Sequence, residues 1–291
     1  MTYRSILRQD CFNGQTIVVT GGGSGIGRCV AHELASLGAH VVITGRKQDK
    51  LDRVLAEIAE DGGSAEARAF DIRDEEAVKE AIASIISARG RIDGLVNNAG
   101  GQFPAPMQSI SKKGFDAVVA NNLTGGFLVM REVYVQAMEA AGGAIVNMAA
   151  DMWRGMPGMA HSGAARAGMV NLTKTAAYEW GPAGVRVNCV APGWIASSGM
   201  DTYDGMTRAL IPQLKRHVPV GRIGVEAEVS AVICFLLSPA ASFVTGVTVP
   251  IDGGSPLGSA LFPIGKGRGT EPFDGFHRAV MPEVLSGKDT G

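Results

Sequence analysis

Residues 15–27 read QTIVVTGGGSGIG, and this stretch decides the fold of the chain. The run from Gln15 to Thr20 is short, apolar and rich in valine and isoleucine, as is typical of a buried strand. Glycines follow it directly, and residues 25–37 then carry apolar positions at helical spacing. The stretch therefore predicts a strand, a tight glycine turn and a helix.

The same alternation continues along the chain. Further apolar runs lie at residues 40–45, 67–72, 93–100, 142–150, 185–193 and 246–254, and helical patterns at residues 47–60, 74–89 and 162–180. Runs that are apolar on nearly every residue indicate strands covered on both faces, and strands separated by helices form parallel sheets. We therefore predict an α/β fold with a single Rossmann-type, doubly wound, seven-stranded parallel sheet and helices on both faces.

A chain of 291 residues can form one large α/β domain. The alternation predicts this domain over residues 1–254. Residues 197–224 interrupt it after the carboxyl end of a strand, where open α/β sheets bind ligands, so this insert is a candidate lid. Residues 255–291 are rich in glycine and proline, which predicts an irregular arm over the surface or onto a neighbouring subunit.

The composition excludes several classes of partner. The chain has 27 basic and 28 acidic residues and a formal net charge of -1, so a nucleic-acid partner is not expected. Its four cysteines form no C-x-x-C pair, which argues against a metal site. There is no signal-like segment and no apolar stretch long enough to span a bilayer. We therefore expect a cytoplasmic protein without a membrane partner.

The glycine turn has the spacing G-x-x-x-G-x-G, from Gly21 to Gly27. Backbone amides and the positive end of the following helix could bind a pyrophosphate there, because glycines let it approach closely. A glycine-rich turn without function is the alternative. The strand and the helix on either side make that alternative much less favourable.

With the sequence NNAG at residues 97–100, this spacing resembles the short-chain dehydrogenase/reductase family over residues 13–254. The resemblance implies a nicotinamide dinucleotide cofactor. The positions that it assigns to the cofactor are Thr20, Gly21, Ser24, Gly25, Ile26 and Gly27 in the turn, Asp71 and Ile72 beside the adenine, Asn98, Ala99 and Gly100 after the fourth strand, Arg166, and Pro192, Gly193 and Ile195 beside the nicotinamide.

The second expected strand ends in Thr44-Gly45-Arg46-Lys47. An acidic residue at this place binds the ribose hydroxyls of NAD, whereas cations pair with the 2′-phosphate of NADP. Arg46 and Lys47 therefore favour NADP(H). The alternative is that both cations belong to a solvated helix start.

The expected catalytic residues depart from the family pattern. Most members use Asn, Ser, Tyr and Lys, with the Tyr four residues before the Lys. Asn122 matches the Asn, but residues 147–150 offer no hydroxyl, Ser162 stands in place of the Tyr and Arg166 in place of the Lys. A guanidinium does not exchange a proton near neutral pH, so we expect Arg166 to hold the nicotinamide ribose and to supply positive charge.

Residues 100–103, 161–168 and 235–243 resemble the peroxisomal type of trans-2-enoyl-CoA reductase and, more distantly, the 2,4-dienoyl-CoA reductases. In that branch a Tyr can stand four residues before the position of Lys174, but here that residue is Val170. A mechanism that needs this phenol is excluded.

We therefore expect an NADPH-dependent oxidoreductase that reduces the conjugated double bond of a trans-2-enoyl-CoA thioester. Ser162, Arg166 and the Gly101 amide would stabilise the charge on the thioester oxygen, and water or His161 would protonate the α-carbon. Two alternatives stay open: a carbonyl or alcohol (3-oxoacyl) oxidoreductase, and a non-catalytic dinucleotide-binding protein. By analogy with the family we expect a homotetramer.

Several of these residues have structural alternatives. Ser162 could be a helix cap and His161 a buried histidine without chemistry. Asp151 and Trp153 are expected either to line the pocket or to pack. The basic lid residues Lys215, Arg216, His217 and Arg222 could meet the phosphates of an acyl-CoA or form a solvated face.

Overall fold

The computed structural model describes residues 2–257, 265, 267 and 269–286, without the side chain of Met206. Seven parallel strands form one sheet in the order β3-β2-β1-β4-β5-β6-β9. Their bounds are β1 Thr16–Thr20, β2 His40–Gly45, β3 Ser64–Ala69, β4 Gly94–Asn97, β5 Gly143–Met148, β6 Val185–Pro192 and β9 Thr248–Ile251. The predicted fold is confirmed. The strand order reverses between β1 and β4, which is where doubly wound sheets bind their ligands.

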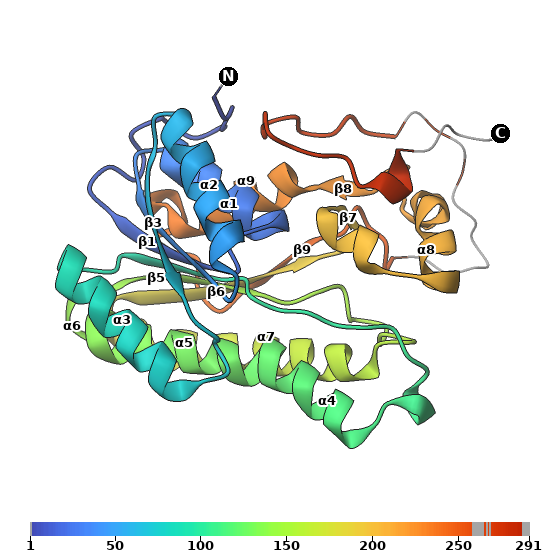
Figure 1. Ribbon diagram of the computed structural model, residues 1–291, viewed down its shortest axis with the longest axis horizontal. Helices are drawn as coiled ribbons and strands as arrows, with labels where there is room; N and C mark the ends of the chain where they lie inside the picture. Colours follow the sequence, from blue (N-terminus) through green and yellow to red (C-terminus); the bar gives the residue numbers. More distant parts are fainter. Residues whose placement is uncertain (1, 258–264, 266, 268, 287–291) are drawn as a thin grey trace.

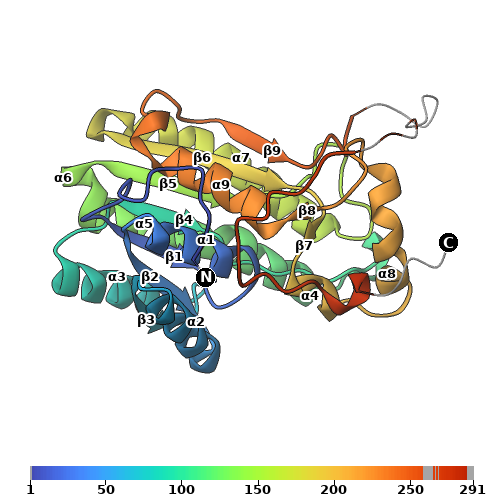
Figure 2. The same cartoon turned by 90° about the horizontal axis from the view of Figure 1, so that it is seen from above.

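Helices cover both faces of the sheet (Figures 1 and 2). On one face lie α1 (Gly25–Ser36), α2 (Gln48–Glu60) and α9 (Glu226–Leu237). On the other lie α3 (Glu75–Arg89), α4 (Lys112–Val119), α5 (Gly125–Val133), α6 (Glu139–Ala141) and α7 (Ala160–Trp180). Consecutive residues of β1 serve the two resulting cores, because Ile17 and Val19 pack toward α1 and α9 while Val18 packs toward α3 and α5. This alternation explains why the strands are apolar at every position.

Two helical stretches and one strand differ from the sequence-based expectation. The stretch from α4 to α6 was not predicted, and it contains two π-helical turns, η2 (Ala120–Thr124) and η3 (Tyr134–Met138), which break the 3.6-residue period. Helix α9 was not predicted either, because it is apolar on most sides and packs on α1 and the sheet. Strand β3 begins three residues earlier than expected, since it is an edge strand with half-exposed polar residues. Asp71 and Ile72 therefore lie in the loop after it.

The insert predicted as a lid lies between two short strands, β7 (Ile195–Ala196) and β8 (Gly224–Val225). These strands pair in parallel, so the insert begins and ends at one point above the carboxyl edge of the main sheet. Between them lie the 3-10 helix η5 (Ser198–Thr202), helix α8 (Gly205–Leu210) and the 3-10 helix η6 (Ile211–His217). Because the two ends of the insert are paired, its middle can change position without disturbing the sheet.

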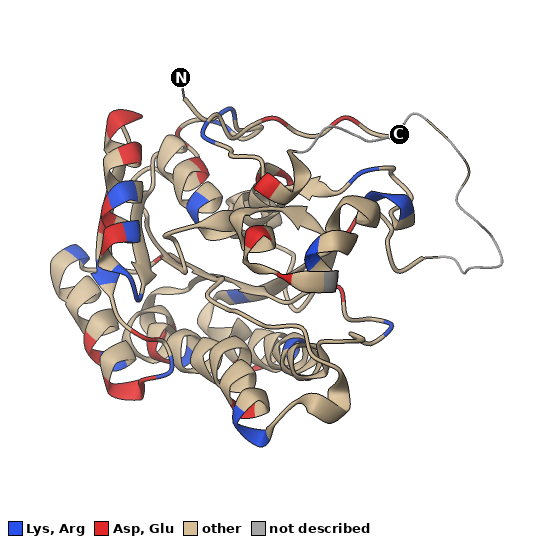
Figure 3. Cartoon of the chain, turned by 45° about the vertical axis from the view of Figure 1, so that its right-hand side comes forward, with Lys and Arg blue, Asp and Glu red and all other residues tan. Residues whose placement is uncertain are grey.

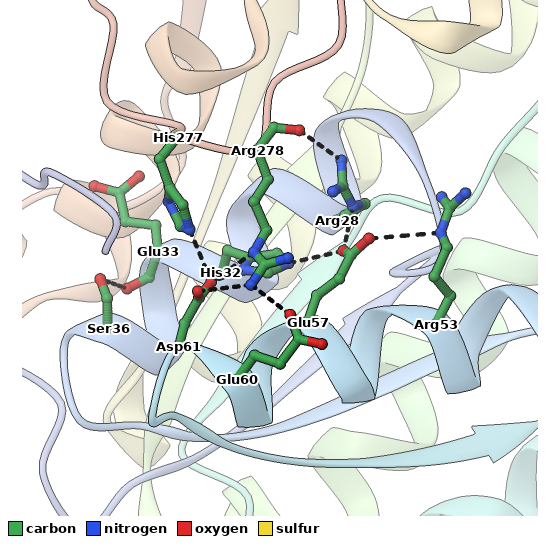
Figure 4. Close-up of polar contacts among 10 residues, drawn as sticks. All are labelled: Arg28, His32, Glu33, Ser36, Arg53, Glu57, Glu60, Asp61, His277 and Arg278. Atoms are coloured by element: carbon green, nitrogen blue, oxygen red, sulfur yellow. Dashed lines mark hydrogen bonds and ion pairs between the residues drawn. The ribbon is translucent and has the colours of Figure 1, made fainter. Parts of the chain in front are cut away.

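The described part of the C-terminal arm packs against α1 and the end of α2 of its own chain. Phe276 is only 2% exposed and packs against Tyr3, His32 and the Arg28 guanidinium. Arg278 binds Asp61 and Glu60 on α2, and His277 lies 2.9 Å from the same Asp61 carboxylate (Figure 4). Residues 258–264, 266, 268 and 287–291 of the expected arm lie outside the described residues.

Acidic and basic residues are interspersed on the face drawn in Figure 3 rather than separated by sign. Over the part of the chain that the structure describes, no helix is both long and apolar enough to cross a membrane.

Candidate active site

Three glycines shape the turn between β1 and α1. Gly21 and Gly27 lie tightly against neighbouring atoms, and Gly25 borders open space. A Cβ on Gly21 would lie 2.9 Å from Asn98 Nδ2, and one on Gly27 would lie 2.4 Å from the Gly21 carbonyl oxygen, so neither position accepts a side chain. Gly25 has a φ of +57° and faces open space, since its Cβ would meet nothing closer than 3.9 Å. A diphosphate fits this cradle at the amino-terminal end of α1.

The side chains of Thr20 and Asn98 hold this turn against β4. Thr20 Oγ1 accepts hydrogen bonds from the backbone amides of Asn98 and Ala99, at 3.0 and 2.9 Å. Asn98 Nδ2 donates to the Thr20 carbonyl oxygen at 2.9 Å. Thr20 is fully buried and Ile26 packs against the core, so these two side chains support the turn from its core side. Ser24, the N-cap residue of α1, is half-exposed.

A cavity of about 200 Å³ opens beside the turn. It brings together most of the predicted cofactor residues, namely Gly21, Ser24, Arg46, Lys47, Asp71, Ile72, Ala99 and Gly100. The lining also includes Lys50, which sequence reasoning missed although it follows Lys47 at helical spacing on α2. Three cations, Arg46, Lys47 and Lys50, therefore border the cavity.

Asp71 is the one carboxylate among the residues that line this cavity. Its pKa is lowered, chiefly by the hydrogen bonds from Arg73, which binds both carboxylate oxygens. Asp71 is therefore ionised and its charge is paired with Arg73, whereas three cations, Arg46, Lys47 and Lys50, line the same cavity.

Asn122 lies in the π-helical turn η2 and is 2% exposed. Its Nδ2 donates to the carbonyl oxygens of Gly101 and Val118, at 2.6 and 2.9 Å, and its Oδ1 accepts from the Gly101 amide at 3.1 Å. The expectation that the Gly101 amide faces the substrate oxygen is therefore wrong, because Asn122 already uses that amide. Asn122 clamps the loop after β4 against the helix.

Arg166 points from α7 toward the end of β5. Its Nη1 donates to the Met148 carbonyl oxygen at 2.7 Å, and a Cβ on Gly100 would lie 2.8 Å from its Nη2. Burial lowers the pKa of Arg166 to about 10, so the guanidinium still carries its charge at neutral pH. Its Nε is buried without a hydrogen-bond partner among the described residues, and it can serve a ribose hydroxyl.

Ser162 lies one turn before Arg166 on α7 and is completely buried. The helix begins at Ala160, with Met159 as its N-cap residue, so Ser162 is not the cap. Its hydroxyl donates to Gln102 Oε1 at 2.5 Å. Gln102 was not among the expected site residues, although it belongs to the stretch 100–103 on which the family resemblance partly rests.

Comparison with known proteins agrees with this geometry. The profile of a family described as Enoyl-(Acyl carrier protein) reductase matches residues 13–255. A solved structure of a short-chain type dehydrogenase/reductase from Mycobacterium marinum is 30% identical, with a TM-score of 0.80 over 85% of this chain and 97% of that one. The chain belongs to the short-chain dehydrogenase/reductase family. It is therefore an oxidoreductase of a family that binds nicotinamide dinucleotides.

Two further members of the family bear on the choice of substrate. The peroxisomal 2,4-dienoyl-CoA reductase of Danio rerio is 36% identical over 262 residues, which are 89% of this chain and 87% of that protein. A solved structure described as citronellol catabolism dehydrogenase (AtuB) of Pseudomonas aeruginosa PAO1 is 61% identical, with a TM-score of 0.80 over 88% of this chain and all of that one.

Two further polar residues of α7, His161 and Lys174, have different surroundings from Ser162 and Arg166. His161 is fully buried, its Nδ1 accepts from the Ser162 amide, and its ring lies edge-on to Phe103. Its Nε2 is buried without a hydrogen-bond partner among the described residues, and its expected role as a proton donor stays a prediction. Lys174, eight residues after Arg166 on the same helix, is exposed, and Val170 is buried.

The remaining predicted residues divide between the sheet edge and the surface. Pro192 ends β6, a Cβ on Gly193 would lie 2.9 Å from Asp252 Cα, and Ile195 packs in the core. They lie outside the lining of the 200 Å³ cavity, and their contact with a nicotinamide stays a prediction. Asp151 is half-buried beside Asp252, and burial followed by that charge raises its pKa, whereas Trp153 is 44% exposed.

The basic lid residues do not form one phosphate site. Arg222 binds both carboxylate oxygens of Glu228 on α9 and donates to the carbonyl oxygens of Thr270 and Glu271 in the arm. Its expected contact with an acyl-CoA phosphate is therefore wrong. Lys215, Arg216 and His217 are exposed at the end of η6.

Proposed function

We propose that this oxidoreductase uses NADPH to reduce the conjugated double bond of a 2-enoyl or 2,4-dienoyl thioester. The observation that carries the proposal is the pair on α7, where a buried serine and a buried arginine replace a phenol and a lysine. Oxidising an alcohol requires a base that removes the hydroxyl proton, and Arg166 does not accept one near neutral pH. Reducing a conjugated thioester requires positive charge near the thioester oxygen, which Arg166 has.

NADP(H) is the proposed cofactor, and the chemistry it supplies when bound is hydride transfer to the β-carbon. The glycine turn would hold its diphosphate, and Arg46, Lys47 and Lys50 would hold the 2′-phosphate. Arg166 Nε and the loop at Gly100 would hold the nicotinamide ribose. The ion pair of Asp71 with Arg73 would reduce its repulsion of the 2′-phosphate.

The chain's own residues then have separable roles. Asn122 ties the loop after β4 to η2 through its hydrogen bonds to Gly101. Arg166 places a fixed charge beside that loop, where it stabilises the negative charge that collects on the thioester oxygen. Ser162 acts through Gln102, because its buried hydroxyl already donates to that side chain.

A second candidate is oxidation of a methyl-branched alcohol such as citronellol, which the description of the Pseudomonas aeruginosa relative favours. It would require a proton acceptor other than Arg166. The name of the Danio rerio relative supports the conjugated thioester.

A panel of initial rates at 340 nm tests the proposal. NADPH would be combined with trans-2-octenoyl-CoA, a 2,4-dienoyl-CoA, a 3-methyl-branched 2-enoyl-CoA, acetoacetyl-CoA and simple ketones, and NADP+ with citronellol. Oxidation of NADPH by the conjugated thioesters but not by the ketones is expected. Turnover of citronellol or ketones alone would reject it in favour of the second candidate or the carbonyl alternative, and tight NADPH binding without any turnover would indicate a non-catalytic binding protein.

We further propose that the protein is a cytoplasmic homotetramer. Large exposed apolar residues on neighbouring helical segments, Phe115 on α4, Phe127 on α5 and Val135 in η3, would be covered by a second copy. Light scattering after gel filtration would test this, and a monomeric mass would contradict it.

A further inference from the structure

A hydrogen-bonded chain joins α7 to the lid. Ser162 Oγ donates to Gln102 Oε1 at 2.5 Å, and Gln102 Nε2 donates to the phenol oxygen of Tyr203 at 3.3 Å. Tyr203 follows η5 in the lid and is half-buried. The position that lacks a phenol on α7 is therefore connected, through one carboxamide, to a phenol from another part of the chain.

The direction of these hydrogen bonds leaves the phenol's proton available. Ser162 has only one hydroxyl hydrogen and Gln102 Oε1 accepts it, so the carboxamide turns its Nε2 toward Tyr203. Tyr203 accepts in that bond through an oxygen lone pair. Its own O–H hydrogen is left for another acceptor, such as a substrate bound beside Gln102.

Other parts of the chain hold the lid segment that carries Tyr203. Asp201 in η5 accepts hydrogen bonds from the backbone amides of Glu283 and Val284 in the arm, at 3.1 and 3.0 Å. Arg208 on α8 donates to the Asp201 carbonyl oxygen at 3.1 Å. Tyr203 is thus placed by the lid, the arm and Gln102 together.

We propose that Tyr203 is the catalytic acid of this enzyme, held over the substrate by Gln102, which Ser162 orients. This inference rests on the proposed reduction of a conjugated thioester and names its proton donor. Gln102 and Ser162 are then positioning residues.

The protonation step balances as follows. Once the β-carbon has received hydride, the thioester carries a negative charge shared between its oxygen and its α-carbon. The O–H bond of Tyr203 breaks and a C–H bond forms at the α-carbon, which leaves a phenolate. Because Tyr203 is half-exposed, water returns the proton to it.

Kinetics of Tyr203→Phe give the first test. We expect kcat to fall by about 10²-fold with KM changed less than about threefold, because the proton donor is gone while the rest of the site is intact. Gln102→Leu should lower kcat by about tenfold. The matched control is Tyr178→Phe, whose phenol is 87% exposed on the far half of α7 and should not matter.

A second readout does not depend on turnover. The chain has four tyrosines, so the protein labelled with 3-fluorotyrosine gives four 19F resonances, and the one missing from Tyr203→Phe belongs to Tyr203. Octanoyl-CoA, added with NADP+, should shift this resonance and leave that of Tyr178 unchanged. Gln102→Leu should shift it even without ligand.

The outcomes separate this inference from the proposed function. Wild-type turnover of enoyl thioesters that survives in Tyr203→Phe, or a Tyr203 resonance that octanoyl-CoA does not move, overturns the role of Tyr203. Loss of activity in Asp151→Asn together with full activity in Tyr203→Phe would assign the acid to Asp151 instead. Absence of wild-type turnover with a shifted Tyr203 resonance overturns the proposed reaction and keeps Tyr203 in the ligand site.

Discussion

Replacing Arg166 by Met tests whether this buried charge serves catalysis or stability. The drop in the pKa of Arg166 to about 10 means that burial costs the charged form about 3 kcal/mol. Its hydrogen bond to the Met148 carbonyl oxygen, at 2.7 Å, offsets about 1.5 to 3 kcal/mol of this. The two contributions nearly cancel, and methionine fills a similar volume.

We therefore expect Arg166→Met to leave the free energy of unfolding within about 1.5 kcal/mol of the wild type. The same variant should lower kcat about 10²-fold, because the thioester oxygen loses its positive neighbour. The dissociation constant for NADPH should rise by less, about fivefold, since the glycine turn and the three cations are intact.

Urea unfolding, initial rates at 340 nm and a fluorescence titration with NADPH measure these three quantities. The matched control is Lys174→Met, which removes an exposed cation from the same helix and should change none of them. A loss of more than about 3 kcal/mol of stability in Arg166→Met would show that the arginine is structural. An unchanged kcat would show that the active site has been misplaced.

Three further predictions concern the cofactor and the arm. Arg46→Ala should raise the Kd for NADPH about tenfold or more and leave that for NADH nearly unchanged, and a greater loss for NADH would refute the role of Arg46. Burial, only partly offset by Arg28, raises the pKa of Glu226 to about 7, and its Oε1 would lie 3.9 Å from a Cβ on Gly25. As the pH rises through 7, Glu226 becomes charged and repels the diphosphate, so the Kd for NADPH should increase about fivefold between pH 6 and 8. Glu226→Gln should abolish this pH dependence. Phe276→Ala should release the arm at a cost of about 3 kcal/mol, seen as faster proteolysis after residue 257 with NADPH binding retained, whereas an unchanged cleavage rate would contradict the anchor.

The sheet, the glycine turn and most residues that line the cavity beside it could be predicted from the sequence alone. Those features depend on neighbours along the chain: apolar runs buried on both faces, glycines where Gly21 and Gly27 lie close to Asn98, and cations directly after β2. The departure of the catalytic residues was also visible, because Ser162 and Arg166 occupy counted positions of one helix. Local spacing is enough to predict all of these.

Which polar groups already have hydrogen-bond partners, and which can bind a ligand, depends on contacts between distant segments. In the structure, Asn122 accepts a hydrogen bond from the Gly101 amide, His161 packs edge-on against Phe103, and Arg222 is paired with Glu228. Gln102 and Tyr203 are 101 residues apart, and no pattern along the chain relates them. Their contact depends on the position of the lid relative to the edge of the sheet. That position is set by packing and hydrogen bonds between distant segments, which sequence spacing does not encode.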